Sequence, residues 1–79
     1  MGKVQFPSMK ADDLLAVLLR DPLNYQIVRQ NGSHRQLRAS GRPNVLFSYH
    51  AGATLPPGVV RHILVKAVGL DVDEARGLL

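Results

Sequence analysis

Two turn signals in the middle of the chain limit its fold more than any other feature. Asn31-Gly32-Ser33 separates residues 25–30 from residues 34–39, and Ser40-Gly41-Arg42-Pro43 separates these from residues 44–49. Short runs that are bounded by glycine, proline and asparagine are typical of strands joined by tight turns. The sequence therefore predicts a meander of three antiparallel strands.

The length of the first loop decides which residues share a face of this sheet. A two-residue Asn31-Gly32 turn would pair Ile27 with Gln36 and mix polar with apolar residues on both faces. A three-residue loop, with Gly32 in the left-handed conformation, pairs Ile27 with Leu37 instead. We expect the three-residue loop, because it sorts the residues by polarity.

In this register Tyr25, Ile27 and Leu37 share the buried face. The open face would carry Val28 and a row of polar residues: Gln26, Gln30, His34, Gln36 and Arg38. Arg29 and Arg35 would then point to the opposite face. His50, two residues beyond Ser48 on strand three, would extend the open face.

A helix is expected on each side of the meander. In the first, Ala11, Leu14, Leu15 and Leu18 recur at helical spacing. Ser8 is the expected N-cap, and Pro22 ends the helix because it keeps Asp21 out of the helical conformation.

The second helix is expected to begin at Pro57 or just after it and to end at a glycine C-cap, Gly69. Asp71 and Glu74 have the spacing of a capping box, which predicts a short terminal helix. The apolar stripe of the second helix comprises Val60, Ile63, Leu64, Ala67 and Val68.

The order of elements predicts an α+β fold in which both main helices cover the apolar face of the sheet. This two-layer α-β-β-β-α arrangement resembles the double-stranded-RNA-binding domain, which recognises the shape of RNA. A chain of 79 residues builds one core, so we expect a single domain over residues 1–79 with an N-terminal extension over residues 1–7.

Charge is distributed unevenly along the chain, which has a net charge of +4. All six acidic residues lie near the ends, at positions 12, 13, 21, 71, 73 and 74. Between Pro22 and Leu70 the charged residues are five arginines and one lysine. A basic segment without acids favours a polyanionic partner such as nucleic acid, or an acidic protein. The alternative is a solvated basic surface without a partner.

The side chains of this segment exclude several kinds of site. Paired-carboxylate catalysis and most Mg²⁺ sites need acids that the segment does not have. The three histidines, at positions 34, 50 and 62, do not have the spacing of a known zinc site, and the sequence contains no cysteine. We therefore expect no metal and no cofactor. No apolar run is long enough to cross a membrane, so a cytoplasmic protein without a membrane partner is expected.

Cleavage of RNA suits the remaining side chains. RNA supplies its own nucleophile, the 2′-hydroxyl, so an enzyme needs a base, an acid and cations for the charge that develops on phosphate. Histidine as a residue type titrates near neutral pH, and arginine binds phosphate oxygens in bidentate fashion. His34, with Arg29, Arg35 and Arg38 nearby in the sequence, has the required chemistry. Alternatively, His34 is simply an exposed residue after a turn.

His50 leaves two interpretations open. It could supply the second proton-transfer group or a phosphate contact, or it could be a loop histidine hydrogen-bonded to backbone.

Three segments together carry a family resemblance: VRQNGSHRQL (28–37), a strand that ends in Tyr49-His50, and LPPGVVRHILVKAVGL (55–70). They resemble the HicA family of toxin mRNA interferases, which has an R-x-x-G-S-H motif before a P-x-G-T helix. The resemblance runs from about Met9 to Leu79. Val59 replaces the usual threonine of the last motif, and Ser48-Tyr49 stands where Val-Pro is common.

The resemblance implies the toxin of a type II toxin–antitoxin system, with a double-stranded-RNA-binding-domain-like fold. Such a toxin cleaves mRNA without a metal and is inhibited by a HicB-like antitoxin that covers its active site. The family's catalytic histidine matches His34, and Gly32 and Ser33 complete the motif. His50 and Lys10 also match family positions, so the expected RNA-binding residues are Lys10, Arg29, Arg35, Arg38 and His50.

Two other functions remain open from the sequence. The same basic face could belong to a non-catalytic RNA-binding module, or it could dock only an acidic protein partner. An enzyme should lose RNA cleavage but keep its RNA affinity when His34 is replaced by alanine, whereas a binding module does not cleave RNA. A protein that docks only an acidic partner should not bind RNA even at low salt.

Overall fold

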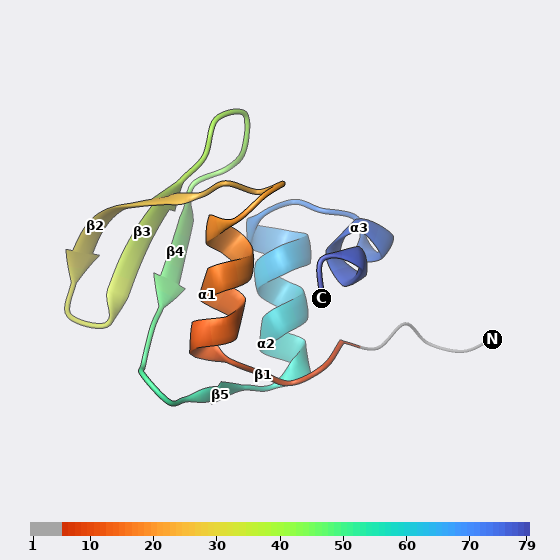
Figure 1. Cartoon of the computed structure of the whole chain (residues 1–79), viewed down its shortest axis with the longest axis horizontal. Helices are drawn as coiled ribbons and strands as arrows, with labels where there is room; N and C mark the ends of the chain where they lie inside the picture. Colours follow the sequence, from red (N-terminus) through yellow and green to blue (C-terminus); the bar gives the residue numbers. More distant parts are fainter. Residues whose placement is uncertain (1–5) are drawn as a thin grey trace.

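The computed structural model describes residues 6–79 and has the expected two layers (Figure 1). A sheet of three antiparallel strands, in the order β2-β3-β4, forms one layer. Helices α1 and α2 lie side by side in the other layer, and the short helix α3 follows beyond them. The predicted α+β class and the three-stranded antiparallel sheet are therefore confirmed. The predicted N-terminal extension lies largely outside the described residues, but Phe6 belongs to the core.

Helix α1 (Ala11–Leu19) is held by an apolar stripe in which Ala11, Leu14, Val17 and Leu18 are buried. The predicted N-cap was wrong. Lys10, not Ser8, is the N-cap, and within the described residues its side chain makes no capping hydrogen bond. The first turn instead carries Asp12 and Asp13, whose negative charge is favourable at the positive end of the helix dipole.

A two-stranded ribbon that the sequence analysis did not predict fixes the start of α1. Strand β1 (Met9–Lys10) pairs with β5 (Thr54–Leu55), and the Ala11 amide donates to the Ala53 carbonyl over 2.9 Å. Two residues are too few for a visible alternation of polar and apolar positions. The ribbon connects the beginning of α1 with the segment that leads into the second helix.

The three-stranded sheet confirms one part of the predicted register and corrects another. β2 (Gln26–Asn31), β3 (His34–Arg38) and β4 (Val45–Ser48) are antiparallel, and Ile27 pairs with Leu37 as predicted. The connecting loop, however, has only two residues, Gly32 and Ser33, because Asn31 already pairs with His34. An irregularity between Ile27 and Arg29 compensates for the shorter loop.

This irregularity is a β-bulge, in which Val28 is the extra residue. On the hairpin side of the bulge, Arg29 pairs with Gln36 and Gln30 pairs with Arg35. Directly paired residues lie on the same face of a sheet. Arg29 and Asn31 therefore lie on the open face, where Gln30 had been expected, and Gln30 lies on the same face as Arg35.

The second helix begins at Pro57 as predicted. α2 (Pro57–Arg61) continues directly into a π-helical segment, η1 (His62–Ala67), and Gly69 adopts a left-handed conformation (φ 90°) beyond its end. The predicted stripe is confirmed, since Val60, Leu64 and Val68 are buried and Ile63 and Ala67 are half-buried. α3 (Val72–Gly77) begins with the predicted capping box between Asp71 and Glu74.

The core lies between the two layers. Leu37, Val45 and Phe47 of the sheet pack in one cluster with Leu14 and Leu18 of α1 and with residues of the second helix. Tyr25, just before β2, is also buried, and its hydroxyl donates to the Pro43 carbonyl over 2.7 Å. The opposite face of the sheet faces away from the helices (Figure 1). Within residues 6–79, no helix has the length and apolar character needed to cross a membrane.

Candidate functional site

His34 begins β3 immediately after the two-residue turn, and its side chain is exposed. It pairs with Asn31 on β2 and with Ser48 on β4. These three residues therefore form one row across the open face of the sheet. The next row on this face contains Arg29, Gln36 and Leu46, since Gln36 pairs with both of the others.

The two rows enclose a shallow depression of about 220 Å³, which is lined by Arg29, Asn31, His34, Gln36 and Leu46. Its side chains comprise one imidazole, one guanidinium, two amides and one exposed leucine. An imidazole can transfer a proton, and a guanidinium and amide N–H groups can bind phosphate oxygens. The depression thus combines a proton-transfer group with anion-binding groups on one open surface.

The bulge brings Arg29 to this depression. In an unbroken ladder with the predicted three-residue loop, Arg29 would point toward the helices, as we expected from the sequence. The shorter loop and the extra residue Val28 place it opposite Gln36 instead. The structure therefore corrects the predicted position of Arg29 and brings it to the same side as His34.

The turn that precedes His34 is held at both of its carbonyl groups. The Arg35 Nη1 atom donates to the Gly32 carbonyl over 2.6 Å, and the Tyr49 amide donates to the Ser33 carbonyl over 2.6 Å. Gly32 has a φ of 61°, in the region that favours glycine. Gly32 and Ser33 thus shape the turn and accept the bonds that fix the backbone next to His34.

Arg35 lies on the other face, as predicted, because it pairs with the buried Phe47. Its guanidinium lies 5.1 Å from the centre of the Tyr49 ring, within the range of a cation–π contact. The Tyr49 hydroxyl donates to the Asp12 carboxylate in the first turn of α1. This hydrogen bond to Asp12 raises the pKa of Tyr49, with smaller contributions from burial and from the charge of Asp12.

Arg35, Tyr49 and Asp12 thus form a chain of contacts from the hairpin turn to α1. Arg35 was expected to bind RNA, but in the structure it binds the Gly32 carbonyl and stacks on Tyr49. Tyr49 and Asp12 were missed as functional candidates. Nothing in their sequence neighbourhood indicates the contact, since the two residues lie 37 positions apart.

The other predicted RNA-binding residues lie outside the depression. Arg38 ends β3, at the opposite end of the open face. His50 is exposed in the turn after β4, where its carbonyl accepts from the Ala53 amide over 3.0 Å. Lys10 is exposed in β1, at the start of α1. The structure therefore brings Arg29 to His34 but does not bring Lys10, Arg38 or His50 into the same depression.

Asn31, Gln36 and Leu46 line the depression but were not predicted as site residues. The alternation of strands three and two places Leu46 and Gln36 on the open face, so the signal for these two was present in the sequence. Asn31 depends on the length of the turn. Among residues 6–79, no group of three or more His, Asp or Glu side chains is arranged to hold a metal ion.

The sequence matches a known protein family. A model of the HicA toxin of bacterial toxin–antitoxin systems matches residues 11–70, which extend from the first residue of α1 to just beyond the second helix. The matched region includes the turn, His34 and every residue that lines the depression. No curated protein and no solved structure shows a significant match.

Proposed function

The chain belongs to the HicA toxin family, and from this premise we propose that it is an endoribonuclease that cleaves mRNA at the depression around His34. The family assigns the chain to a toxin–antitoxin system. The observation that carries the further step is the convergence of His34 and Arg29 on one open surface. That convergence offers proton transfer and phosphate binding side by side, on a protein with a basic central segment.

In the proposed reaction the 2′-oxygen of a ribose attacks the neighbouring phosphorus atom, and the bond from phosphorus to the 5′-oxygen of the next nucleotide breaks. The His34 imidazole either accepts the proton of the 2′-hydroxyl or donates a proton to the departing 5′-oxygen. The Arg29 guanidinium and the amides of Asn31 and Gln36 offer N–H groups to the phosphate oxygens. We propose that the reaction proceeds without a metal and takes place in the cytoplasm.

One imidazole cannot be base and acid in a single concerted step. The second proton-transfer group in this proposal is water or a residue near the turn. Ser48 pairs with His34 across the sheet and is a nearer candidate than His50, which follows β4. Gly32 and Ser33 contribute through the backbone of the turn.

An antitoxin partner follows from the family, and we propose that it is a HicB-like protein that covers the depression. Two large apolar side chains are exposed on this part of the sheet, Leu46 at 60% and Val28 at 51%. Leu46 lines the depression itself. An antitoxin that buries Leu46 would therefore also exclude RNA from His34.

The experiment compares RNA cleavage by the parent protein and by His34→Ala, with EDTA present to remove divalent cations. Loss of general acid–base catalysis lowers the rate by about 10²–10⁴-fold. His62→Ala is the matched control, because His62 is an exposed histidine on the helical layer. The proposal fails if the His34→Ala protein cleaves RNA as fast as the parent, or if EDTA abolishes cleavage by the parent.

Measuring both RNA binding and RNA cleavage, for the parent and for His34→Ala, distinguishes the enzyme from a non-catalytic binding module. The proposed enzyme binds RNA with nearly unchanged affinity after the substitution but no longer cleaves it. A binding module would show no cleavage by the parent protein either.

A further inference from the structure

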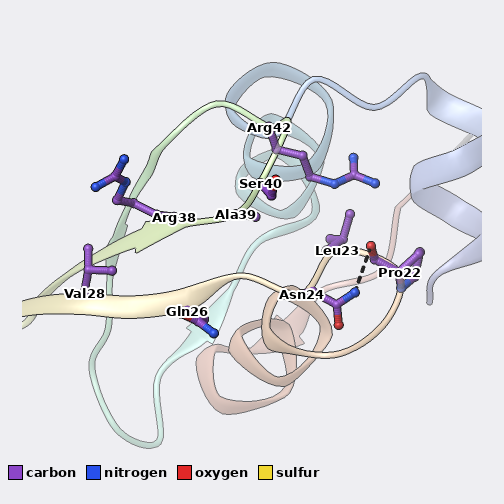
Figure 2. A pocket seen from close by; sticks show the side chains of 9 residues that line it. All are labelled: Pro22, Leu23, Asn24, Gln26, Val28, Arg38, Ala39, Ser40 and Arg42. Atoms are coloured by element: carbon purple, nitrogen blue, oxygen red, sulfur yellow. Dashed lines mark hydrogen bonds between the residues drawn. The ribbon is translucent and has the colours of Figure 1, made fainter.

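A second recess lies at the other end of the open face, beyond Arg38. It is a groove of about 600 Å³ between the end of β3, the turn after it and the segment that leads into β2. Its polar lining comprises Asn24, Gln26, Arg38, Ser40 and Arg42, and its apolar lining comprises Pro22, Leu23, Val28 and Ala39. We call it the arginine groove (Figure 2).

The charge of the groove has one sign. Two of its nine lining residues are arginines and none is acidic. Figure 2 shows the two guanidinium groups at opposite ends of the groove, with Ser40 between them. Asp21, the neighbouring acid in the sequence, accepts a hydrogen bond from the Asn24 side-chain amide over 2.6 Å. A groove with a cation at each end fits an extended polyanion better than a single small anion.

The backbone holds Arg42 in place. Gly41 has a φ of 74°, and the Arg42 amide donates to the Ala39 carbonyl over 3.2 Å, which closes the turn after β3. The next residue, Pro43, accepts the hydrogen bond of the buried Tyr25 hydroxyl. Burial raises the pKa of Tyr25, while the positive charge of Arg42 acts in the opposite direction.

The arginine groove lies in line with His34 along one strand. Arg38 and His34 are both on β3, an even number of positions apart, so their side chains lie on the same face. At a strand rise of about 3.3 Å per residue, their Cα atoms are about 13 Å apart. This separation is larger than a phosphate group, so an anion in the groove is not the phosphate at His34.

We propose that the arginine groove binds the sugar–phosphate backbone of single-stranded RNA beyond the cleaved bond. Arg38 and Arg42 each contact a phosphate that is not cleaved. This inference rests on the proposed function, because it assumes that RNA occupies the open face at His34. Arg42 thereby gains a role in RNA binding, although it belongs neither to the sequence motif nor to the depression. Arg38 would contact a phosphate that is not cleaved, whereas Arg29 would contact the phosphate at His34.

The test measures binding of a single-stranded RNA oligonucleotide at several salt concentrations, in a His34→Ala background so that the RNA stays intact. For single strands, each phosphate contact contributes about −0.7 to the slope of log K against log salt concentration. Arg42→Gln should make the slope shallower by about 0.7, and Arg38→Gln with Arg42→Gln by about 1.4. Affinity at low salt should fall about tenfold for each arginine.

Two variants control for charge and folding. Arg61→Gln removes the same charge from α2 in the helical layer and should leave the slope unchanged. Arg42→Lys keeps the positive charge and should keep most of the slope. The proposal is overturned if Arg42→Gln and Arg61→Gln have equal effects. It is also overturned if Arg42→Gln weakens binding of the antitoxin while RNA binding is unaffected.

Cleavage by the parent protein is measured separately and decides the proposed function. If the parent cleaves RNA but Arg42→Gln does not change the salt slope, only the groove proposal is wrong. If the parent does not cleave RNA but the slope changes as expected, the catalytic proposal is wrong and the groove binds RNA without it.

Discussion

The two ends of the open sheet face have different chemistry. At the hairpin end, His34 and Arg29 line a depression of about 220 Å³. At the other end, Arg38 and Arg42 line a larger groove of about 600 Å³ that contains no histidine. A histidine can exchange a proton near neutral pH, whereas an arginine keeps its charge. The difference indicates that one end is suited to proton transfer and the other only to holding an anion.

The ends also share a structural device. A tyrosine hydroxyl donates a hydrogen bond at each, from Tyr49 to Asp12 at the hairpin end and from Tyr25 to the Pro43 carbonyl at the other. The first bond connects the end of β4 to α1, and the second connects the segment before β2 to the residue that follows Arg42. At each end of the open face, a tyrosine thus fixes the backbone next to the site residues.

The largest expected difference between the two ends is the effect of Arg29 on the cleavage rate. Arg29→Gln removes the cation beside His34, and we expect kcat to fall by roughly 10²-fold, the range measured when one donor to a developing oxyanion is removed. Single-turnover cleavage at saturating protein concentration measures this value. Arg42→Gln is the matched substitution at the other end, and its effect should appear in KM. Equal changes in kcat for the two variants would show that the ends do not differ in role.

The bulge and the turn provide the next test. Deletion of Val28 should retain cleavage, because Ile27 still pairs with Leu37 and Arg29 still pairs with Gln36. Insertion of one glycine after Gly32 lengthens only the turn and should also retain cleavage, because Asn31 still pairs with His34 and Arg29 still pairs with Gln36. Cleavage rates of the two variants test this expectation. Loss of activity only in the deletion variant would contradict the assignment of Val28 as the bulged residue.

The smallest effect concerns alkaline pH. The hydrogen bond to Asp12 raises the pKa of Tyr49 above its ordinary value of 10.0, and burial raises that of Tyr25. A raised pKa means that folding favours the neutral phenol. Both hydroxyls therefore stabilise the fold fully below pH 10, and this contribution is lost as the pH rises through the raised values.

Denaturant unfolding at several pH values between about 8 and 11 measures this contribution. The difference in free energy of unfolding between the parent and Tyr49→Phe should be constant below pH 10 and should shrink above it. Tyr25→Phe should show the same behaviour for the groove end. A difference that grows with pH would mean that the assigned direction of the pKa change is wrong.

Periodicity predicted most of the fold. The stripe from Val60 to Val68, the glycine at the end of the second helix and the capping box at Asp71 are local patterns, and the structure contains all three. The β1–β5 ribbon was missed, because pairing between two-residue strands far apart in the chain leaves no local pattern. The N-cap at Ser8 was wrong for a related reason, since the ribbon fixes where α1 begins.

The candidate site was predictable in identity more than in geometry. The position of His34 on the open face follows from strand alternation. Arg29 was assigned to the wrong face, because two irregularities cancel between Ile27 and Gly32: a turn shortened by one residue and a bulge that adds one. Separation of polar from apolar residues fixes only the pairing of Ile27 with Leu37. This pair is present both in the predicted register, with a three-residue loop and no bulge, and in the observed register, with a two-residue turn and a bulge. Apart from Val28, the residues between that pair and the turn are polar, so no burial pattern distinguishes the two registers.

The β1–β5 ribbon has a consequence for the order of folding. The two hairpins of the sheet join strands that are neighbours in the chain, so their contacts close short loops. The ribbon closes a much longer loop, which contains α1 and all three strands of the sheet. Because the entropic cost of closure grows with loop length, the ribbon is expected to form late, after the hairpins. The chain thus builds the strand that carries His34 before it connects the starts of its two main helices.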